Sequence, residues 1–458
     1  MCQISSPLSP TVRSIFPCTV DFPLLYGYNK VCCGARDAAF CHPGAAFAWT
    51  VSPSRKRGQN TPRAVTQPAR PVMKGGMRFL EHYLDYAATT PVRPEAAQAA
   101  LSAMTEGFYN PSSRYAPARQ AAQRLEEHRA AVAAALGARP EEIVFTSCGT
   151  ESDNWAIQAA VRAGRHRGRH IVTTAVEHSA VLEPIRALER EGCSVTWLQP
   201  DRSGHIAPEQ VAAALREDTV LVSMMLVNNE VGTLLPVAEA ARAIRESGCP
   251  ALLHCDAVQG FLKVPFTAKE LGVDLLSISG HKIGAPKGIG ALYLRRGLKL
   301  SPLMLGGGQE SGLRPGTEPT AQIAAFAAAV RAGQATLSQD LTAMAELKEY
   351  GLRVLAAALP QLKIISPGYA PHIFAVTLPG YKSEVLVRFL SDRGIYLSSG
   401  SACHRGKPSH VFAALGLPKP WLDGALRISL SPRTARADLD ALAEGLAAAG
   451  EQLFSTLS

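Results

Sequence analysis

A lysine and an aspartate stand near the ends of two apolar runs that follow one another along the chain. Lys282 ends the run LLSISGHK (275–282), and Asp256 lies in ALLHCDAVQG (251–260). Parallel strands end at the same edge of a sheet, where open α/β sheets bind their ligands. A lysine amine there can hold an aldehyde as a Schiff base, and an aspartate on a neighbouring strand can keep a ring nitrogen protonated. The pair is what the chemistry of pyridoxal phosphate (PLP) needs.

Other polar residues follow apolar runs in the same way. His178 ends HIVTTAVEH, Asn228 and Asn229 lie near the end of TVLVSMMLVNNEVGT, and FTSCGTESDN (145–154) places small hydroxyl residues between a predicted strand and a predicted helix. A single lysine or aspartate in such a place is more often a solvated strand end or a cap. The prediction therefore depends on several such residues meeting at one edge of the sheet.

From Tyr83 to about Gly450 the chain resembles the cysteine desulfurases of the iron–sulfur cluster assembly type, PLP enzymes of the aminotransferase class V family. The segments that carry the resemblance, in chain order, are YLDYAATTPVRPE, YNPSSRY, FTSCGTESDN, VEHSAV, VNNEVGT, HCDAVQ, SISGHKIGAPKG, GGGQESGLRPGTEP, SSGSACHRGKPSH and LRISLSP. Because they recur in the family's order across nearly the whole chain after residue 76, chance matching does not explain them.

The net charge of +9 is concentrated in the first residues of the 458. Residues 1–76 hold nine Lys or Arg and two Asp, so they carry seven of these charges and the remainder carries two. A body with so little net charge favours a small-molecule enzyme over a protein with a basic groove for nucleic acid. No apolar run approaches the ~20 residues of a membrane helix, so we expect a soluble protein without a membrane partner.

Ten cysteines divide equally between residues 1–76 and the rest of the chain. None of those after residue 76 forms a CxxC pair or a cluster with histidine at zinc spacing, so no metal site is predicted. Free thiols are typical of a reducing compartment, which favours a cytoplasmic location.

Residues 1–76 contain no Glu and show neither heptads nor strand alternation, so we expect an unstructured extension. A basic segment poor in acidic residues is typical of an organelle transit peptide. This one lacks a convincing amphipathic basic helix, and its five cysteines are unusual for such a peptide. We therefore favour the alternative that translation starts at Met77.

The body predicts an α/β protein of two domains. Between about Pro94 and Val330, β-branched runs alternate with Ala-rich segments of helical period, which is typical of a mostly parallel sheet with crossover helices. The shorter strands and the final Ala/Leu-rich helix that follow indicate a smaller α+β domain. The resemblance implies the PLP-dependent transferase fold type I and a homodimer that shares its active sites. The expected boundaries are 77–92 for an N-terminal arm joining the small domain, 93–335 for the large PLP-binding domain and 336–458 for the small domain carrying the catalytic Cys loop.

The resemblance assigns the residues around the cofactor ring. Lys282 holds the cofactor covalently and later moves protons, and Asp256 pairs with the ring nitrogen. His178 stacks on the ring and assists proton transfer, although a histidine at a strand end is otherwise often a satisfied core group. Asn229 and Gln259 are expected to hydrogen-bond the phenolic oxygen side of the ring.

The cofactor phosphate needs several donors together. Gly149 and Thr150 open a predicted helix, whose N-terminus offers backbone N–H groups and the positive end of its dipole. Ser279 and His281 flank the lysine and are expected to add further donors. The resemblance implies that Thr317, in the glycine-rich loop, reaches the phosphate of the partner subunit.

Arg427, in LRISLSP, matches the arginine that binds the substrate carboxylate, a role suited to a bidentate guanidinium. Asn229 is a second expected substrate-binding residue. A salt bridge at a strand end is the alternative for an isolated arginine in a strand.

Cys403 decides the reaction that the resemblance implies. It lies in SSGSACHRGK, a run of small residues that does not form core, and the basic residues His404, Arg405 and Lys407 would favour its thiolate. The thiolate attacks the sulfur of L-cysteine, L-alanine leaves, and the persulfide on Cys403 is passed to an acceptor. That acceptor is expected to be an iron–sulfur cluster scaffold or a tRNA-thiolation enzyme.

Three departures from the family pattern leave questions open. Cys148 stands where the family usually has glycine, Tyr115 replaces a usual histidine, and the four residues HRGK between Cys403 and PSH make a shorter loop than in the long-loop members. Selenocysteine lyase would use the same residues, so it remains an alternative, as does another class V reaction. A transaminase does not need Cys403, and a non-catalytic sulfur-assembly scaffold would not need Lys282, Asp256 or His178.

Overall fold

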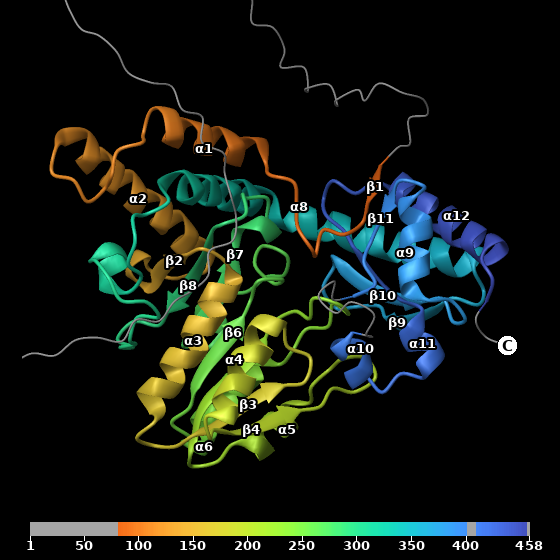
Figure 1. Ribbon diagram of the computed structural model, residues 1–458, viewed down its shortest axis with the longest axis horizontal. Coiled ribbons are helices and arrows are strands. Elements are labelled where there is room, and N and C mark those ends of the chain that lie inside the picture. Colours follow the sequence, from red (N-terminus) through yellow and green to blue (C-terminus); the bar gives the residue numbers. More distant parts are fainter. Residues whose placement is uncertain (1–80, 401–408, 456–458) are drawn as a thin grey trace, which may run out of the picture. The chain divides into compact units, whose positions relative to one another are not determined.

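A seven-stranded mixed sheet forms the centre of the fold in the computed structural model, which describes residues 81–400 and 409–455 (Figure 1). Its order is β2 (Ile143–Thr146), β8 (Gly290–Leu294), β7 (Leu275–Ser279), β6 (Leu252–Asp256), β5 (Thr219–Met225), β3 (His170–Thr174) and β4 (Ser194–Leu198). The strands β4, β3, β5, β6 and β7 pair in parallel, and β8 is antiparallel to both of its neighbours. The parallel strands therefore end at one edge of the sheet.

Helices cover both faces of this sheet because its strands are apolar on both sides. Leu252 and Leu253, successive residues of β6, lie in different apolar cores, as the two-residue period of a strand requires. The helices of this region are α1 (Pro94–Thr105), α2 (Ala116–Ala135), α3 (Gly149–Gly164), α4 (Ser179–Arg190), α5 (Pro208–Ala214), α6 (Val237–Ser247) and α7 (Ala268–Leu271), with 3-10 turns η1 (Pro140–Glu142), η2 (Gly280–Lys282) and η3 (Gln309–Gly312). In Figure 1, α3 and α4 lie in front of the sheet.

A second group of elements follows the long helix α8 (Thr320–Ala358), which packs against α1 and α2 and against the C-terminal helix α12 (Arg436–Gln452). Strands β9 (Lys363–Ser366), β10 (Ile373–Thr377) and β12 (Ala425–Ser429) form an antiparallel sheet, with α9 (Ser383–Ser391), α10 (His410–Ala414), α11 (Lys419–Asp423) and α12 (Arg436–Gln452) around it. The chain before α1 joins this group, since β1 (His82–Tyr83) pairs with β11 (Ile395–Tyr396) and Asp85 bridges to Ser429.

The α/β class and the mostly parallel sheet confirm the fold expected from the sequence. The expected boundary at 335/336 falls inside the continuous helix α8, so the division into domains remains a prediction. The expected extension 1–76 and its interpretation lie outside the described residues. No helix within residues 81–400 and 409–455 is long and apolar enough to cross a membrane.

A buried ion pair anchors the glycine-rich loop before α8. Arg129 on α2 donates two hydrogen bonds to Glu310, of 2.6 and 2.9 Å, and Glu310 also accepts from the backbone N–H of Phe145 at 2.9 Å. Glu310 and Ser311 have φ of 48° and 57°, a left-handed conformation that costs side-chain-bearing residues energy. The ion pair therefore holds a strained loop against the sheet.

Glu310→Ala is expected to lower the free energy of unfolding by about 3–5 kcal/mol, because the buried Arg129 guanidinium loses the buried carboxylate that accepts two hydrogen bonds from it. The matched control is Glu126→Ala, since the Glu126 carboxylate contacts the same guanidinium but is 60% exposed. Its loss should cost less than about 1 kcal/mol. Urea unfolding followed by circular dichroism compares the two variants, and equal losses would contradict the assignment.

Candidate active site

A cavity of about 280 Å³ opens at the carboxyl edge of the parallel strands. Its lining includes ten residues that the sequence analysis singled out: Gly149, Thr150, His178, Asn229, Asp256, Gln259, Ser279, His281, Lys282 and Arg427. A larger cavity of about 710 Å³ runs along α3 and α4 and shares Thr150 and His178 with it. The smaller cavity is the candidate active site, because the converging lysine, carboxylate and imidazole line it.

Lys282 reaches the cavity from the 3-10 turn η2, three residues after β7 ends. Its Nζ donates hydrogen bonds to the carbonyls of Ala87 and Ala88, at 2.6 and 2.9 Å. Burial and the positive charge of Arg427 lower the pKa of Lys282 to about 8. The neutral, nucleophilic form of the amine therefore predominates above about pH 8, at a lower pH than for an ordinary lysine.

Asp256 is the last residue of β6 and is buried. Its Oδ1 accepts a hydrogen bond of 2.9 Å from the backbone N–H of Val258. Burial and the charge of Asp153 raise the pKa of Asp256 to about 7. A buried carboxylate in this state gains stability from a cationic partner, which a protonated ring nitrogen would supply.

His178 caps the N-terminus of α4, and its Nδ1 accepts a hydrogen bond of 3.1 Å from the backbone N–H of Ala180. Burial lowers the pKa of His178, so the ring is neutral at pH 7. Since Nδ1 acts as an acceptor, the single ring proton is on Nε2. The side chain thus has a fixed tautomer at the cavity wall.

The cavity holds polar atoms that no protein group satisfies within the described residues. Asn229 Oδ1, Gln259 Oε1, Ser279 Oγ and Arg427 Nε are buried without a hydrogen-bond partner there. Such atoms cost stability unless a ligand or water pairs with them. They include acceptors, a hydroxyl and a cationic donor, which fits a ligand as varied in its polar groups as PLP.

The start of α3 forms one wall of the same cavity. A side chain at Gly149 would place its Cβ 2.8 Å from Val258 Cγ2, so this position needs glycine. Thr150 follows in the first turn, and the N-terminal N–H groups of a helix favour a bound phosphate. His281 lies nearby with its Nδ1 3.2 Å from Thr89 Oγ1, and burial and the charge of Lys282 lower its pKa to about 4.

Arg427 lies on β12 and reaches the cavity from the C-terminal elements. Its Nη2 donates to Asp85 Oδ1 at 2.7 Å, and its Nη1 donates to the carbonyl of Asn229 at 2.9 Å. The salt bridge that the sequence left as an alternative is therefore present. It orients the guanidinium and leaves Nε without a partner among the described residues.

Two predicted site residues are not part of this cavity as described. Thr317 is exposed in the loop before α8 and is absent from the described lining. Cys403, with the rest of 401–408, lies outside the described residues. Of the departures from the family pattern, Cys148 lines the cavity and Tyr115 is 54% exposed next to Tyr109.

Several residues that build the site were not predicted from the sequence. Asp85 pairs with Arg427, and the carbonyl of Ala87 accepts from both Lys282 and Gln259. His254 could have been found, because it lies two residues before Asp256 in the same strand and so on the same face. The contacts of Asp85 and Ala87 had no such signal.

Comparisons with known proteins show the family to which the chain belongs. The aminotransferase class-V family model matches residues 82–442. A cysteine desulfurase IscS of Methanosarcina thermophila is 40% identical over 368 residues, which cover 79% of this chain and 90% of the relative. The chain therefore belongs to the aminotransferase class-V family and, within it, to the cysteine desulfurases, which use PLP as cofactor.

Solved structures are also similar to this chain over most of its length. One titled "NifS-like protein" has a TM-score of 0.77 and 34% identity, and covers 82% of this chain and 100% of its own. Another, titled "SspA in complex with cysteine", has a TM-score of 0.68 and 35% identity, and covers 77% of this chain and 100% of its own.

Proposed function

We propose that this chain is a PLP-dependent cysteine desulfurase that converts L-cysteine to L-alanine and holds the sulfur as a persulfide on Cys403. The observation that carries the proposal is the cavity in which Lys282, Asp256 and His178 converge beside buried polar atoms that lack partners. The similarity to curated cysteine desulfurases over most of the chain supports the substrate and the reaction.

Lys282, Asp256 and His178 would act around the ring of the bound cofactor. Bound PLP would withdraw electrons from the α-carbon of the substrate. Lys282 would attach the cofactor and, once released, carry a proton from the α-carbon as a neutral amine. Asp256 would hold the proton of the ring nitrogen, and His178 would lie against the ring with its Nε2–H as the proton donor.

The remaining residues would bind polar groups of the cofactor and the substrate. Gly149, Thr150, Ser279 and His281 would hold the phosphate, and Asn229 and Gln259 would face the phenolic oxygen. Arg427 would bind the substrate carboxylate, with Asp85 fixing its orientation through the ion pair already present.

Cys403 would carry out the sulfur transfer. Its thiolate attacks the sulfur of the substrate, an S–S bond forms, and the C–S bond of the substrate breaks. The electron pair of that bond stays on the former β-carbon, which takes up a proton and becomes the methyl group of alanine. The transfer needs no external oxidant. The outer sulfur of the persulfide would then pass to a cluster scaffold or a tRNA-thiolation enzyme.

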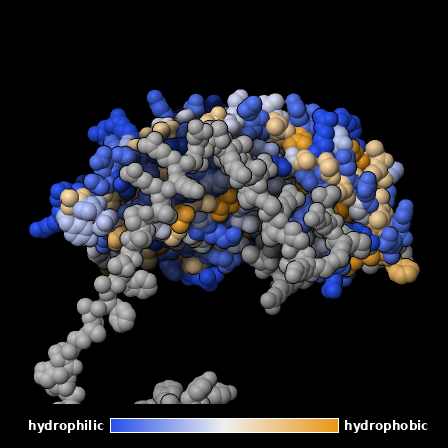
Figure 2. Space-filling model, turned by 90° about the horizontal axis from the view of Figure 1, so that it is seen from above, coloured by the Kyte–Doolittle hydropathy of each residue, from blue (hydrophilic) through white to orange (hydrophobic). Residues whose placement is uncertain are grey.

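A homodimer would complete the site. Thr317 is exposed on its own subunit, which suits the proposed contact with the phosphate of a partner. Exposed apolar side chains also occur on and after α1, among them Leu101, Met104 and Phe108, at 50%, 58% and 63% exposure. The face in Figure 2 shows apolar groups scattered among hydrophilic ones.

We also propose a cytoplasmic location, in line with the four free cysteines of the described residues.

Incubating the purified chain and PLP with L-cysteine tests the proposal, with alanine and sulfide as the measured products. Equal amounts of the two in the presence of a reductant are expected. L-Selenocysteine in a parallel reaction separates the alternative, because a selenocysteine lyase would act on it and leave L-cysteine unchanged. Transfer of the amino group without sulfide would instead indicate a transaminase, and no product from either substrate would indicate a scaffold.

Uptake of PLP by the apo chain is expected to become faster as the pH rises through about 8, the lowered pKa of Lys282. Below that pH the amine is protonated and cannot attack the aldehyde, whereas above it the neutral form predominates. Stopped-flow absorbance after mixing gives the rate at each pH. The exposed Lys287→Ala variant should keep the same profile. A rate still rising steeply near pH 10.5, the ordinary value for lysine, would contradict the lowered pKa.

A further inference from the structure

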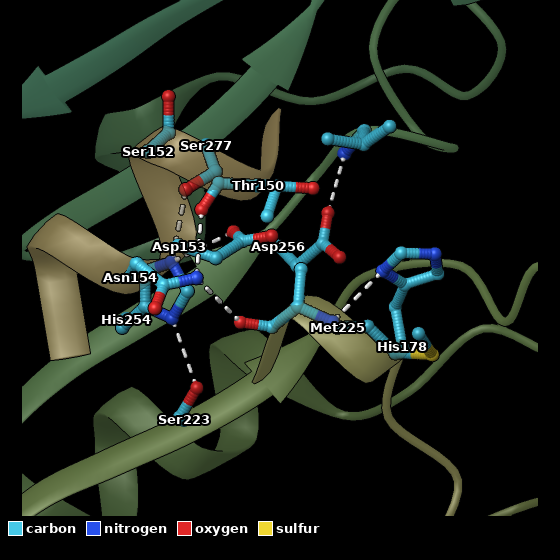
Figure 3. Close-up of polar contacts among 12 residues, drawn as sticks. Thr150, Ser152, Asp153, Asn154, His178, Ser223, Met225, His254, Asp256 and Ser277 are labelled. Atoms are coloured by element: carbon cyan, nitrogen blue, oxygen red, sulfur yellow. Dashed lines mark hydrogen bonds and ion pairs between the residues drawn. The ribbon is translucent and has the colours of Figure 1, made fainter. Parts of the chain in front are cut away.

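A buried chain of hydrogen bonds lies behind Asp256 (Figure 3). Ser223 on β5 contacts His254 Nδ1 at 2.9 Å, and His254 Nε2 contacts Ser277 on β7 at 3.1 Å. His254 Nε2 also lies 3.5 Å from Oδ1 of Asp153, which comes from α3. Ser223, His254, Ser277 and Asp153 are at most 1% exposed, so bulk water does not satisfy them.

Each hydrogen bond in this network can be assigned a donor and an acceptor. Burial lowers the pKa of His254 to about 4, so its ring is neutral and carries one proton. Burial raises the pKa of Asp153 to about 7, and the neighbouring Ser277 hydroxyl opposes this rise. The Ser277 oxygen then accepts from His254 Nε2–H, and His254 Nδ1 accepts from the Ser223 hydroxyl. The hydrogen bonds donated by Ser223 and His254 thus both point toward Ser277, on the side of His254 where Asp153 lies.

Asp153 and Asp256 influence one another because they lie in the same buried region. After burial itself, the charge of Asp153 is the largest cause of the raised pKa of Asp256, and the nearby rings of His178 and His254 act in the opposite direction. Glu177 is also buried, and burial and the two aspartates raise its pKa to about 8. The pKa of Asp153, at about 7, lies below that of Glu177, so Asp153 ionises at the lower pH and is the carboxylate that adds negative charge behind Asp256.

A carboxylate next to a cation holds it more strongly when a second negative charge stands behind it. We propose that Asp153, held by Ser277 and His254, is a positioning residue that acts through Asp256 and keeps the ring nitrogen of bound PLP protonated. The inference rests on the proposed role of Asp256 at that nitrogen. The network thus gives Asp153 an electrostatic role. The packing of its side chain alone would not require a charge there.

The test uses the holoenzyme loaded with PLP that carries ¹⁵N in its ring, and follows the ¹⁵N chemical shift with pH. The wild type is expected to keep the ring nitrogen protonated into the alkaline range. Asp153→Asn, which keeps the shape but removes the charge, should lower the midpoint of deprotonation by about 1 pH unit or more. Asp392→Asn, at an exposed aspartate, is the control and should match the wild type.

Two further variants make each outcome decisive. Ser277→Ala removes the hydroxyl that lowers the pKa of Asp153, so less of Asp153 is ionised and the midpoint should shift in the same direction by less. This variant decides the question if Asp153→Asn does not fold. If Asp153→Asn folds and its midpoint is unchanged, the inference is overturned. If only Ser277→Ala folds, an unchanged midpoint in that variant overturns it. If Asp256→Asn alone loses the ring proton, the role of Asp256 stands without Asp153. If Asp256→Asn also keeps it, the role of Asp256 itself is wrong.

Discussion

Lys282→Ala yields a folded protein that attaches no PLP and has lost turnover of L-cysteine by at least about 10³-fold. General acid–base catalysis by one positioned group contributes about 10²–10⁴ in rate, and this lysine is also the proposed attachment point. The fold should survive because the hydrogen bonds of the side chain go to two backbone carbonyls at the wall of the cavity. Those carbonyls belong to Ala87 and Ala88, next to a cavity that water can enter.

Mass spectrometry after borohydride reduction measures the attachment, because reduction makes the bond between lysine and cofactor permanent. The wild type should gain the mass of the cofactor on the peptide that contains Lys282, and the variant should not. Lys287→Ala removes an exposed lysine five positions later and should behave as the wild type. A Lys282→Ala protein that still carries reduced cofactor, or turns over cysteine at the wild-type rate, would remove Lys282 from the mechanism.

The positions of Lys282, Asp256 and His178 could be predicted because each ends or follows a strand whose apolar residues are plain in the sequence. Parallel strands end at one edge, so polar residues that follow them are brought together whatever the lengths of the connecting helices. Asp256 and Lys282 thus reached one cavity from β6 and the turn after β7. The α/β class was predictable for a related reason. Apolar strand runs alternate along the chain with crossover helices, and each helix has its own periodic pattern.

The contacts that complete the cavity could not be predicted in the same way. The carbonyl of Ala87 is 195 residues from Lys282 in the chain, and Asp85 is 342 residues from Arg427. A backbone carbonyl has no signature in the sequence, and a distant ion pair follows from how β1 and β12 come together. The strained conformation of Glu310 likewise depends on its partner on α2 rather than on its neighbours.

The buried titratable groups near Asp256 were partly predictable. His254 alternates with Asp256 across Cys255, so the two-residue period of the strand places both on one face. Asp153 gave a weaker signal, because an acidic residue in the second turn of a helix is usually a solvated one. Only the sheet beneath α3 shows that this carboxylate is buried.

Cys403→Ser should keep the cofactor and bind L-cysteine, yet form no persulfide and release alanine only at the background rate. Serine is nearly isosteric with cysteine, so attachment of PLP to Lys282 should not change. A hydroxyl is a far poorer nucleophile toward the substrate sulfur than a thiolate, and the sulfur transfer therefore stops. The variant separates sulfur transfer from the other reactions that PLP supports.

Mass spectrometry of the intact chain after brief exposure to L-cysteine locates the sulfur, and the alanine released is measured in parallel. The wild type should gain one sulfur atom on the peptide that contains Cys403. Cys148→Ser is the matched control, because Cys148 is the cavity's thiol among the described residues, and it should still form the persulfide. If the added sulfur is instead on Cys148, that residue is the nucleophile. If Cys403→Ser makes alanine at an undiminished rate and no thiol gains sulfur, a lyase or a transaminase has to replace the desulfurase.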